Sequence, residues 1–392
     1  MKGKRVLCAV LAAALLSGAP CLALEGEEAV FSPAPDVAAP SAILTEKRTG
    51  QVLFEKNADE KLEPASVTKI MTILLIVEAI EDGRLTLDES VTASARAASM
   101  GGSQIFLAEG ESMSVRDMLK AIVVASANDA AVAMAEKLAG TEDAFVSLMN
   151  ERAQALGMTN TVFKNCTGLP DDREHLTTAR DISLMARELI SHEEIKQYTT
   201  IWTDTLRNGE FGLSNTNKLI RFYDGATGLK TGYTSRAGHC LAATAERDGV
   251  EYIAVVLHCE SSDARFESAK ALLSYAFASY TLYEPTPERA LPPVRVTLGE
   301  KTFVRAELAE SPPLLLPRGG GEIERRTELE SEVPAPVAAG DELGLLTLTQ
   351  DGRTLAEIPL LAAEASPKLT RFRVWLKTAA AMYAGADFGG KS

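Results

Sequence analysis

The sequence is poor in the cysteines on which small secreted scaffolds depend. Its 392 residues include five cysteines, and two of them fall in an N-terminal segment that we expect to be removed. The remaining three are an odd and widely spaced set, which is not a disulfide framework. They are Cys166, Cys240 and Cys259. With a two-residue turn at 248–249, residue 240 faces residue 257, so a bridge between residues 240 and 259 is not favoured, although it stays open.

Histidine is equally scarce, and its spacing suits no metal ion. The four histidines form no HExxH pair, and no Cys/His spacing matches a metal site. We interpret His192, with the two glutamates that follow it, as the solvated start of a helix. No metal and no organic cofactor is therefore expected.

Positive charge is also in deficit. The chain has 40 basic against 54 acidic residues, a formal net charge of −14. Binding to nucleic acid or to another polyanion requires a basic field, so these partners are excluded. A local basic pocket for a single carboxylate is still allowed.

The chain has no long hydrophobic run. The one apolar stretch near the N-terminus, residues 6–16, is shorter than the roughly 20 residues that a membrane-spanning helix needs. It follows Lys2, Lys4 and Arg5 and precedes small residues at 21–23, which is the pattern of a cleaved signal peptide. A membrane-anchoring helix is the alternative, and Pro20 argues against a lipoprotein site at Cys21. We expect an exported protein that acts at the outer face of the cytoplasmic membrane or in the cell wall.

Length and pattern predict several domains. Alternation around Thr49-Gly50 predicts a hairpin with strands at 42–47 and 51–55. Helices are expected next at 66–80, 114–124, 129–138, 144–156 and 178–190. Strands at 239–245 and 252–258 and a closing helix at 263–279 follow. This order suits an α/β (α+β) fold in which one antiparallel sheet is assembled from both ends of the segment around a helical cluster.

Prolines and turn residues after position 282 mark a change of architecture. Short strands separated by glycine turns predict a small all-β domain with no catalytic constellation. The expected boundaries are a signal peptide at 1–23, a flexible leader at 24–40, a catalytic domain at 41–282, a linker at 283–293, a β-rich domain at 294–364 and an amphipathic tail at 367–392. The tail carries apolar residues and one Trp among four basic residues, a composition typical of a helix on a membrane surface. Packing of this helix on the β domain is the alternative.

The first chemical motif is Ser66-Val67-Thr68-Lys69. On a helix, residues three apart share one face, so Lys69 can reach the Ser66 hydroxyl. Serine is a poor nucleophile until a base takes its proton, and an exposed lysine with a pKa of about 10.4 cannot be that base. A lysine that is desolvated near other cations can. The spacing alone occurs by chance about once in a chain of this length.

Two further motifs supply the missing partners. Ser126-Ala127-Asn128 lies between two helices, where Ser126 can relay protons and Asn128 can bind a substrate amide, unless Ser126 is only a helix cap. Lys230-Thr231-Gly232 enters a strand, where the lysine and the threonine hydroxyl can bind a substrate carboxylate. We expect Gly232 to let a substrate backbone lie against the strand edge. An ordinary edge strand with a charged residue is the alternative.

Together these three motifs resemble those of the penicillin-recognising serine enzymes, whose S-x-x-K, S-x-N and K-T-G signatures line one cleft. Within that superfamily the chain is most similar to the D-alanyl-D-alanine carboxypeptidases, low-molecular-mass penicillin-binding proteins that are serine peptidases of the S11 type. The similarity covers residues 40–280 most strongly. The segments that carry it are 64–72, 101–103, 126–130, 177–181, 215–219 and 227–234.

The resemblance implies a role for each motif residue. Ser66 is the expected nucleophile, Lys69 its base and Ser126 the third catalytic residue. The backbone N–H groups of Ser66 and Tyr233 are the expected oxyanion hole. The expected substrate-binding residues are Asn128, Lys230, Thr231, Gly232, Tyr233 and Arg265. Arg207 is a weaker candidate for the same region, and the expected cause of a neutral Lys69 is the neighbouring cation Lys230 together with burial.

The implied activity is removal of the terminal D-alanine from the pentapeptide stem of peptidoglycan, with β-lactams acylating the same serine. A DD-endopeptidase uses the same chemistry on crosslinks. A β-lactamase of the superfamily needs a water-activating glutamate, and Glu193, Glu194 and Glu210 lie in no recognisable loop motif for it. A catalytically inactive wall-binding protein is disfavoured because the motif residues are intact.

Overall fold

The computed structural model of the protein describes residues 34–386. The expected signal peptide at 1–23 and most of the expected leader lie outside this range. The last residues of the leader pack instead of hanging free. Val37 and Ala39 are buried, and Lys56 Nζ donates a hydrogen bond of 2.8 Å to the carbonyl of Val37. The ordered part of the catalytic domain therefore starts before the expected boundary at residue 41.

A five-stranded antiparallel sheet organises the catalytic domain, in the order β2-β1-β9-β8-β7. Its outer hairpin comes from the start of the domain, and its other three strands come from the end, as the sequence predicts. The strands are β1 (Ser41–Glu46), β2 (Val52–Lys56), β7 (Ala226–Thr234), β8 (Gly238–Arg247) and β9 (Val250–Cys259). This arrangement leaves β7 as an edge strand.

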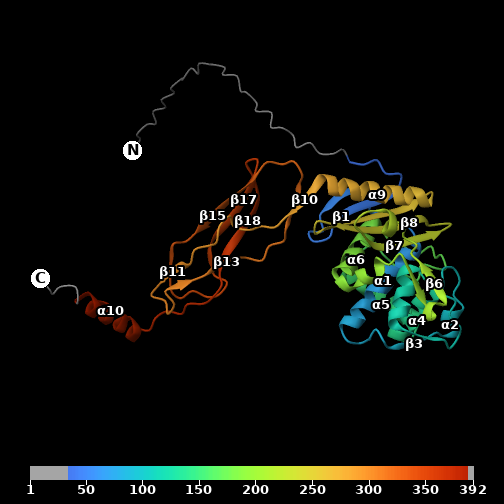
Figure 1. Cartoon of the computed structure of the whole chain (residues 1–392), viewed down its shortest axis with the longest axis horizontal. Helices are drawn as coiled ribbons and strands as arrows, with labels where there is room; N and C mark the ends of the chain where they lie inside the picture. Colours follow the sequence, from blue (N-terminus) through green and yellow to red (C-terminus); the bar gives the residue numbers. More distant parts are fainter. Residues whose placement is uncertain (1–33, 387–392) are drawn as a thin grey trace, which may run out of the picture.

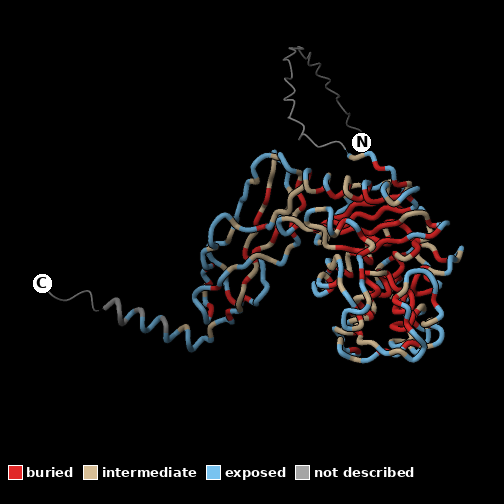
Figure 2. Tube along the Cα trace, turned by 45° about the vertical axis from the view of Figure 1, so that its right-hand side comes forward, coloured by how far each residue is buried: buried red, intermediate tan, exposed pale blue. Residues whose placement is uncertain are grey.

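Alternation along the strands gives the sheet two buried faces. On β9, Ile253 and Val255 join one hydrophobic cluster, whereas Tyr252 and Ala254 join another. Helix α9 (Ser262–Ser279) covers the second face, and the helical cluster covers the first (Figures 1 and 2). That cluster consists of α1 (Lys69–Glu81), α2 (Ala95–Ala98), α3 (Val115–Val124), α4 (Asn128–Ala139), α5 (Glu142–Ala155) and α6 (Ala179–Ser191), with the short pair β3 (Ser90–Thr92) and β4 (Ser112–Ser114).

Polar caps explain where several of these helices begin. The Ser114 side chain accepts a hydrogen bond from the Asp117 N–H, so the predicted start of α3 is confirmed. Thr141, Thr178 and Ser261 cap α5, α6 and α9 in the same way. The first turn before α1 is a separate 3₁₀ helix, η1 (Ala65–Thr68). Because the motif serine lies in η1, it is held in a tighter turn than an α-helix provides.

Smaller elements connect α6 to β7. They are η2 (Glu193–Ile195), α7 (Lys196–Thr199), β5 (Thr203–Leu206), η3 (Arg207–Gly209), β6 (Phe211–Ser214) and α8 (Leu219–Phe222). The hairpin of β8 and β9 has the predicted register, with Leu241 opposite Val256, but a bulge then brings His239 opposite Cys259. The three described cysteines are buried and unbridged.

The β-rich part begins earlier than predicted. Strand β10 (Tyr280–Tyr283) follows α9 directly and pairs with β14 (Leu314–Pro317), so the proline-rich segment lies inside the β architecture. Its other strands are β11 (Val294–Thr297), β12 (Phe303–Val304), β13 (Ala306–Leu308), β15 (Ile323–Leu329), β16 (Glu332–Pro334), β17 (Glu342–Gln350) and β18 (Arg353–Ala362). This part extends away from the catalytic domain, and helix α10 (Arg371–Ala386) projects from its far end (Figure 1).

Candidate active site

The site is built around the contact between Ser66 and Lys69. Ser66 lies in η1, and Lys69 is the first residue of α1. Lys69 Nζ is 2.9 Å from Ser66 Oγ and donates a second hydrogen bond of 2.8 Å to the carbonyl of Thr167. The expected contact between the serine and the lysine is confirmed. The Thr167 carbonyl, from another loop, holds the amine in place.

Burial gives Lys69 an unusually low pKa. The side chain is fully buried, and desolvation lowers its pKa to about 7, against opposing effects of Cys166 and Asp129. We expected Lys230 to share in this effect. Desolvation is the leading cause, and the repulsion between the two lysines is instead felt at Lys230, whose pKa lies well below its ordinary value because of burial, Lys69 and Arg265.

The second motif joins α3 to α4 in a strained turn. Ser126 is buried with φ of 62°, a left-handed conformation that serine rarely adopts. It does not cap the helix, since the residue before α4 is Ala127, which has no side-chain cap bond. Asn128 donates from Nδ2 to the carbonyl of Gly101 at 2.7 Å, while its buried Oδ1 has no partner within residues 34–386. That oxygen is available to a substrate N–H.

The third motif lies on the edge strand β7. Lys230 is buried, and its Nζ donates to the carbonyl of Thr231 at 3.0 Å. Thr231 Oγ1 is 2.7 Å from the hydroxyl of Thr216. In the described chain Lys230 has no ion pair with a carboxylate, so the amine is suited to a carboxylate that the substrate brings.

The structure gives Gly232 a second reason to be glycine, besides the one we expected. A Cβ at this position would lie 2.7 Å from the carbonyl oxygen of Pro64 and 3.1 Å from the N of Ser66. The glycine therefore allows η1 itself, and not only a substrate backbone, to approach the strand. This close contact brings the edge of β7 against the turn that carries Ser66.

Two further candidates from the sequence lie on this strand or against it. Tyr233 is 58% exposed and stacks on His239, with ring centroids 4.3 Å apart. Arg265 is buried on α9, and its Nη1 donates to the carbonyl of Gly232 at 3.0 Å. Burial lowers the pKa of Arg265, the expected result for a cation without a carboxylate close by. Arg207 pairs with Glu111 at 2.8 Å and donates to the carbonyl of Ile105.

Sequence reasoning missed the loop at 165–169. The side-chain oxygen of Asn165 accepts the N–H groups of Thr167 and Gly168, at 3.2 and 2.6 Å. The loop thereby presents the Thr167 carbonyl to Lys69. Gly168 packs so closely that a Cβ there would lie 1.9 Å from the carbonyl oxygen of Ala65. An Asn followed three residues later by Gly is the only signal in the sequence, and it indicates a turn and not a site.

A second group supports the third motif from behind; it lies in the segment 215–219, which carries the family resemblance but had no role assigned to it. Asn217, which is buried, donates from Nδ2 to the carbonyl of Gly228 at 2.7 Å and is itself positioned by the side chain of Asn215. Between them, the Thr216 N–H bonds the carbonyl of Val124, at the end of α3. These residues thus connect the helix before the second motif to the strand of the third.

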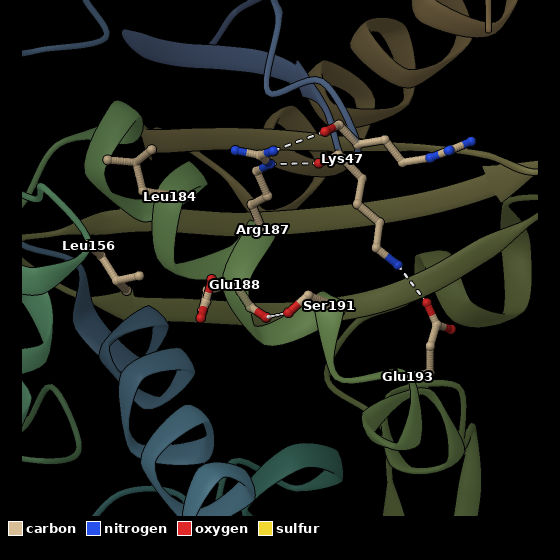
Figure 3. Close-up of a pocket in the computed structure, with 8 residues that line it drawn as sticks. Lys47, Leu156, Leu184, Arg187, Glu188, Ser191 and Glu193 are labelled. Atoms are coloured by element: carbon tan, nitrogen blue, oxygen red, sulfur yellow. Dashed lines mark hydrogen bonds and ion pairs between the residues drawn. The ribbon is translucent and has the colours of Figure 1, made fainter. Parts of the chain in front are cut away.

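A separate pocket lies beside α6, between its exposed side and the turn of β1 and β2 (Figure 3). Arg187 donates to the carbonyls of Lys47 and Arg48, at 2.6 and 3.0 Å, and Lys47 pairs with Glu193 at 2.7 Å. Glu193, one of the glutamates considered for a β-lactamase, is thus bound to lysines and bonds neither Ser66 nor Lys69.

One group of side chains in the described range has the geometry of metal ligands. Atoms of Glu78, Glu188 and His192 lie within 4.8 Å of one another. Arg152 bridges the two carboxylates at 2.6 and 2.5 Å, and His192 pairs with Glu81 at 2.8 Å. The guanidinium already supplies the cation, so the group functions as an ion-pair cluster at the end of α1.

Comparisons with known proteins identify the family of the chain. Residues 28–261 match the family model described as D-alanyl-D-alanine carboxypeptidase, and residues 289–368 match the penicillin-binding protein 5 C-terminal domain. D-alanyl-D-alanine carboxypeptidase DacF of Bacillus subtilis is 43% identical over 83% of this chain and 85% of its own length. DacC of Escherichia coli is 33% identical over 84% and 85%.

Solved structures give the same result for the fold. Penicillin-binding protein 5 from Haemophilus influenzae superposes with a TM-score of 0.73 at 28% identity, covering 85% of this chain and 99% of that one. Penicillin-binding protein D2 from Listeria monocytogenes, in its ampicillin-bound form, has a TM-score of 0.57 at 33% identity, covering 62% and 100%. The chain belongs to the D-alanyl-D-alanine carboxypeptidase family of penicillin-binding serine peptidases.

Proposed function

We propose that this serine-type D-Ala-D-Ala carboxypeptidase trims peptidoglycan pentapeptide stems, with Ser66 as nucleophile and Lys69 as its general base. The observation that carries this assignment is the 2.9 Å contact between Lys69 Nζ and Ser66 Oγ, combined with a lysine pKa of about 7. Half of the amines are then neutral near pH 7 and can accept the serine proton.

Acylation begins when Ser66 Oγ attacks the carbonyl carbon of the penultimate D-alanine. Its proton passes to Lys69 Nζ, and the new C–O bond gives a tetrahedral oxyanion. The N–H groups of Ser66 and Tyr233 stabilise this oxyanion; the 3.1 Å between the Cβ position of Gly232 and the Ser66 nitrogen supports their proximity. The C–N bond then breaks, and the amine of the departing D-alanine receives the proton through Ser126.

Deacylation repeats these steps with water. The water loses a proton to Lys69, its oxygen bonds the ester carbon, and the bond to Ser66 Oγ breaks as the serine regains a proton. The loop that contacts Lys69 presents only the Thr167 carbonyl and contains no carboxylate between residues 165 and 169. The acyl-enzyme formed with a β-lactam should therefore persist, unlike that of a β-lactamase with a water-activating glutamate.

Substrate recognition is assigned to the cationic side of the site. Lys230 and Thr231 bind the terminal carboxylate, and Asn128 Oδ1 accepts an N–H of the peptide backbone. Arg265 acts through the strand, because its guanidinium bonds the carbonyl of Gly232. A bound carboxylate would stabilise the charged form of Lys230, whose amine lacks a counter-ion in the described part of the free enzyme.

Labelled penicillin and the peptide diacetyl-Lys-D-Ala-D-Ala test this proposal. The purified enzyme should form a lasting adduct and release D-alanine, and Ser66→Ala should lose both. Ser191→Ala is a matched control, since Ser191 is exposed on α6 and bonds only the carbonyl of Glu188. Rapid penicillin turnover without D-alanine release would indicate a β-lactamase, and cleavage of crosslinked dimers alone would indicate an endopeptidase. The lack of any adduct would refute the assignment.

The tail is proposed to hold the exported enzyme on a membrane surface. In the described range, no helix has the length and apolar character needed to span a bilayer. Helix α10 nevertheless exposes large apolar side chains, with Phe372 69% and Trp375 64% exposed. Its one ion pair in the described range, Arg373 with Glu300 at 3.0 Å, lies near its start. These features support interfacial binding over packing on the β strands.

Flotation with anionic liposomes tests the tail. The full chain should float, and a chain that ends at residue 366 should not. Paired substitution of Phe372 and Trp375 by serine should weaken flotation while leaving penicillin binding unchanged. Flotation of the truncated chain would refute this role for α10. With α10 on the membrane, the β-rich part would act as a spacer between the membrane and the catalytic domain, in keeping with its extended position in Figure 1.

A further inference from the structure

The imidazole of His175 has no part in the proposed chemistry, yet it is one side chain away from the turn of the nucleophile. It is 3% exposed and packs edge-on against Phe163, with ring centroids 5.7 Å apart. Its Nε2 lies 2.9 Å from Thr68 Oγ1. Thr68 is fully buried and stands between Ser66 and Lys69 in the chain.

The hydrogen bonds around this ring leave only one arrangement of protons. Thr68 Oγ1 donates its single proton to the carbonyl of Ala65 at 2.7 Å, so it can only accept from the imidazole. His175 Nε2 therefore carries hydrogen and donates it to Thr68. The other nitrogen, Nδ1, accepts the backbone N–H of Lys164 at 3.3 Å. Both nitrogens are satisfied by the neutral ring, and a second ring proton would face the N–H of Lys164.

The carbonyl at the end of this series of hydrogen bonds belongs to a strained residue, Ala65. Ala65 precedes Ser66 directly and has φ of 48°, in the left-handed region that L-residues other than Asn and Asp rarely enter. Such a conformation persists only where the surroundings enforce it. Two groups enclose its carbonyl: the Thr68 hydroxyl on one side and the backbone of Gly168 on the other, where no side chain would fit.

We infer that His175 is a positioning residue for the nucleophile: through Thr68 it holds the Ala65 carbonyl and so fixes the left-handed turn that presents Ser66 to Lys69. The inference rests on the proposed role of Ser66. His175 touches neither substrate nor the reacting atoms, and its effect on the reaction passes entirely through the geometry of η1. The Gly168 loop supports the same turn from the other side and also holds Lys69 through the Thr167 carbonyl.

Burial keeps this ring neutral while the enzyme works. Burial lowers the pKa of His175 to about 4, whereas Asp172 raises it and Lys164 lowers it. Lys164 is paired with Glu174 at 2.7 Å. A small pocket beside the ring is lined by other acidic residues, Glu63 and Asp171. The pH dependence of acylation near neutrality therefore belongs to Lys69, and His175 supplies a constant geometric constraint.

The test measures acylation of the full chain by labelled penicillin under single-turnover conditions. The final amplitude of labelling reports the fraction of folded sites, and the second-order rate constant reports how well Ser66 is presented. His175→Leu and Thr68→Val remove the two links. His175→Gln and Thr68→Ser are their matched controls, because glutamine keeps an N–H in reach of Thr68 and serine keeps the hydroxyl.

Both disruptive variants should keep full amplitude but react roughly ten- to a hundredfold more slowly, the usual effect of a misplaced reacting group. The two conservative variants should stay within about threefold of wild type. The double variant His175→Leu/Thr68→Val should be no slower than the slower single variant, because the residues act in series. The midpoint of the acid limb should stay where it is in wild type, since Lys69 is unchanged.

Wild-type rate constants in both disruptive variants would overturn the inference, as would reduced amplitude with an unchanged rate constant, which marks a merely structural role. A low rate constant for Thr68→Val together with a wild-type rate constant for His175→Leu would show that the histidine has no part in positioning Ser66. A shifted midpoint with a normal plateau would indicate an electrostatic effect on Lys69 instead. Absence of labelling in wild type would overturn the proposed function together with this inference, whereas the other outcomes leave the proposed function intact.

Discussion

The pH dependence of acylation follows from the burial of Lys69. With an ordinary lysine pKa of 10.5, about one site in 3,000 would hold a neutral amine at pH 7. The pKa of about 7 makes that fraction about one half. Burial therefore increases the reactive fraction at neutral pH by roughly three orders of magnitude. The fall of the pKa from 10.5 to about 7 corresponds to about 5 kcal/mol of differential stabilisation of the neutral form.

Stopped-flow acylation with a fluorescent penicillin between pH 5 and 9 would measure this directly. The second-order rate constant should rise about tenfold per pH unit below 7 and level off above it, because only the neutral amine accepts the serine proton. Active-site titration at each pH separates this effect from unfolding. A rate constant independent of pH down to 5, or a midpoint above 9, would refute the role of a desolvated Lys69 as base.

Three further results are expected. Asp129→Asn should move the acid limb to lower pH in the same assay, because the Asp129 carboxylate stabilises the charged form of Lys69; an upward shift would contradict this. Lys69→Met should raise the free energy of unfolding, measured by urea denaturation. Because the pKa of Lys69 is depressed in the folded state, the cost of burying this lysine is largest below pH 7 and fades as the pH rises to 10.5. The increase in unfolding free energy of the variant over wild type should therefore shrink between pH 7 and 10.5. An equal increase at both ends of this range would contradict the prediction. Gly168→Ala should lower the melting temperature far more than Gly83→Ala. Both glycines have positive φ, so an alanine costs about 1–2 kcal/mol at either position, but only at residue 168 would the added Cβ lie within 2 Å of a backbone atom. Equal losses in melting temperature would contradict this account.

The elements that hold the site were predictable where one local pattern determined them. Alternation around Thr49-Gly50 predicts the first hairpin, and the Ser114 cap predicts the start of α3; both are confirmed. The spacing of Ser66 and Lys69 predicts their contact, since residues three apart meet on any helical turn. The β10 strand was missed because its partner, β14, lies about 30 residues farther along and no local pattern indicates the pairing.

The supporting groups of the site were hidden for a physical reason. The Thr167 carbonyl that holds Lys69 is a backbone group. Every residue has such a carbonyl, so the residue type does not reveal which one will contact the lysine. The role of Gly232 also depends on what lies across from it, which is the turn at Pro64 and Ser66. Contacts of this kind arise from chain segments brought together by the fold, so a sequence motif marks the reacting side chain and not what positions it.

The distribution of charge explains how an acidic protein can serve a carboxylate substrate. The chain carries a net charge of −14, yet three cations are buried around the turn η1. They are Lys69, Lys230 and Arg265. Asp129 does not neutralise them fully, because its carboxylate is engaged by the N–H groups of Ile105 and Leu107. Isolated buried cations are costly, and here the cost lowers the pKa of all three. In the proposed mechanism, a substrate that brings its own carboxylate supplies the missing counter-ion beside Lys230 and leaves Lys69 neutral as the base. The depressed pKa values thus favour a ligand with one terminal carboxylate, a feature shared by D-Ala-D-Ala peptides and penicillins, over the polyanions that the surface charge already repels.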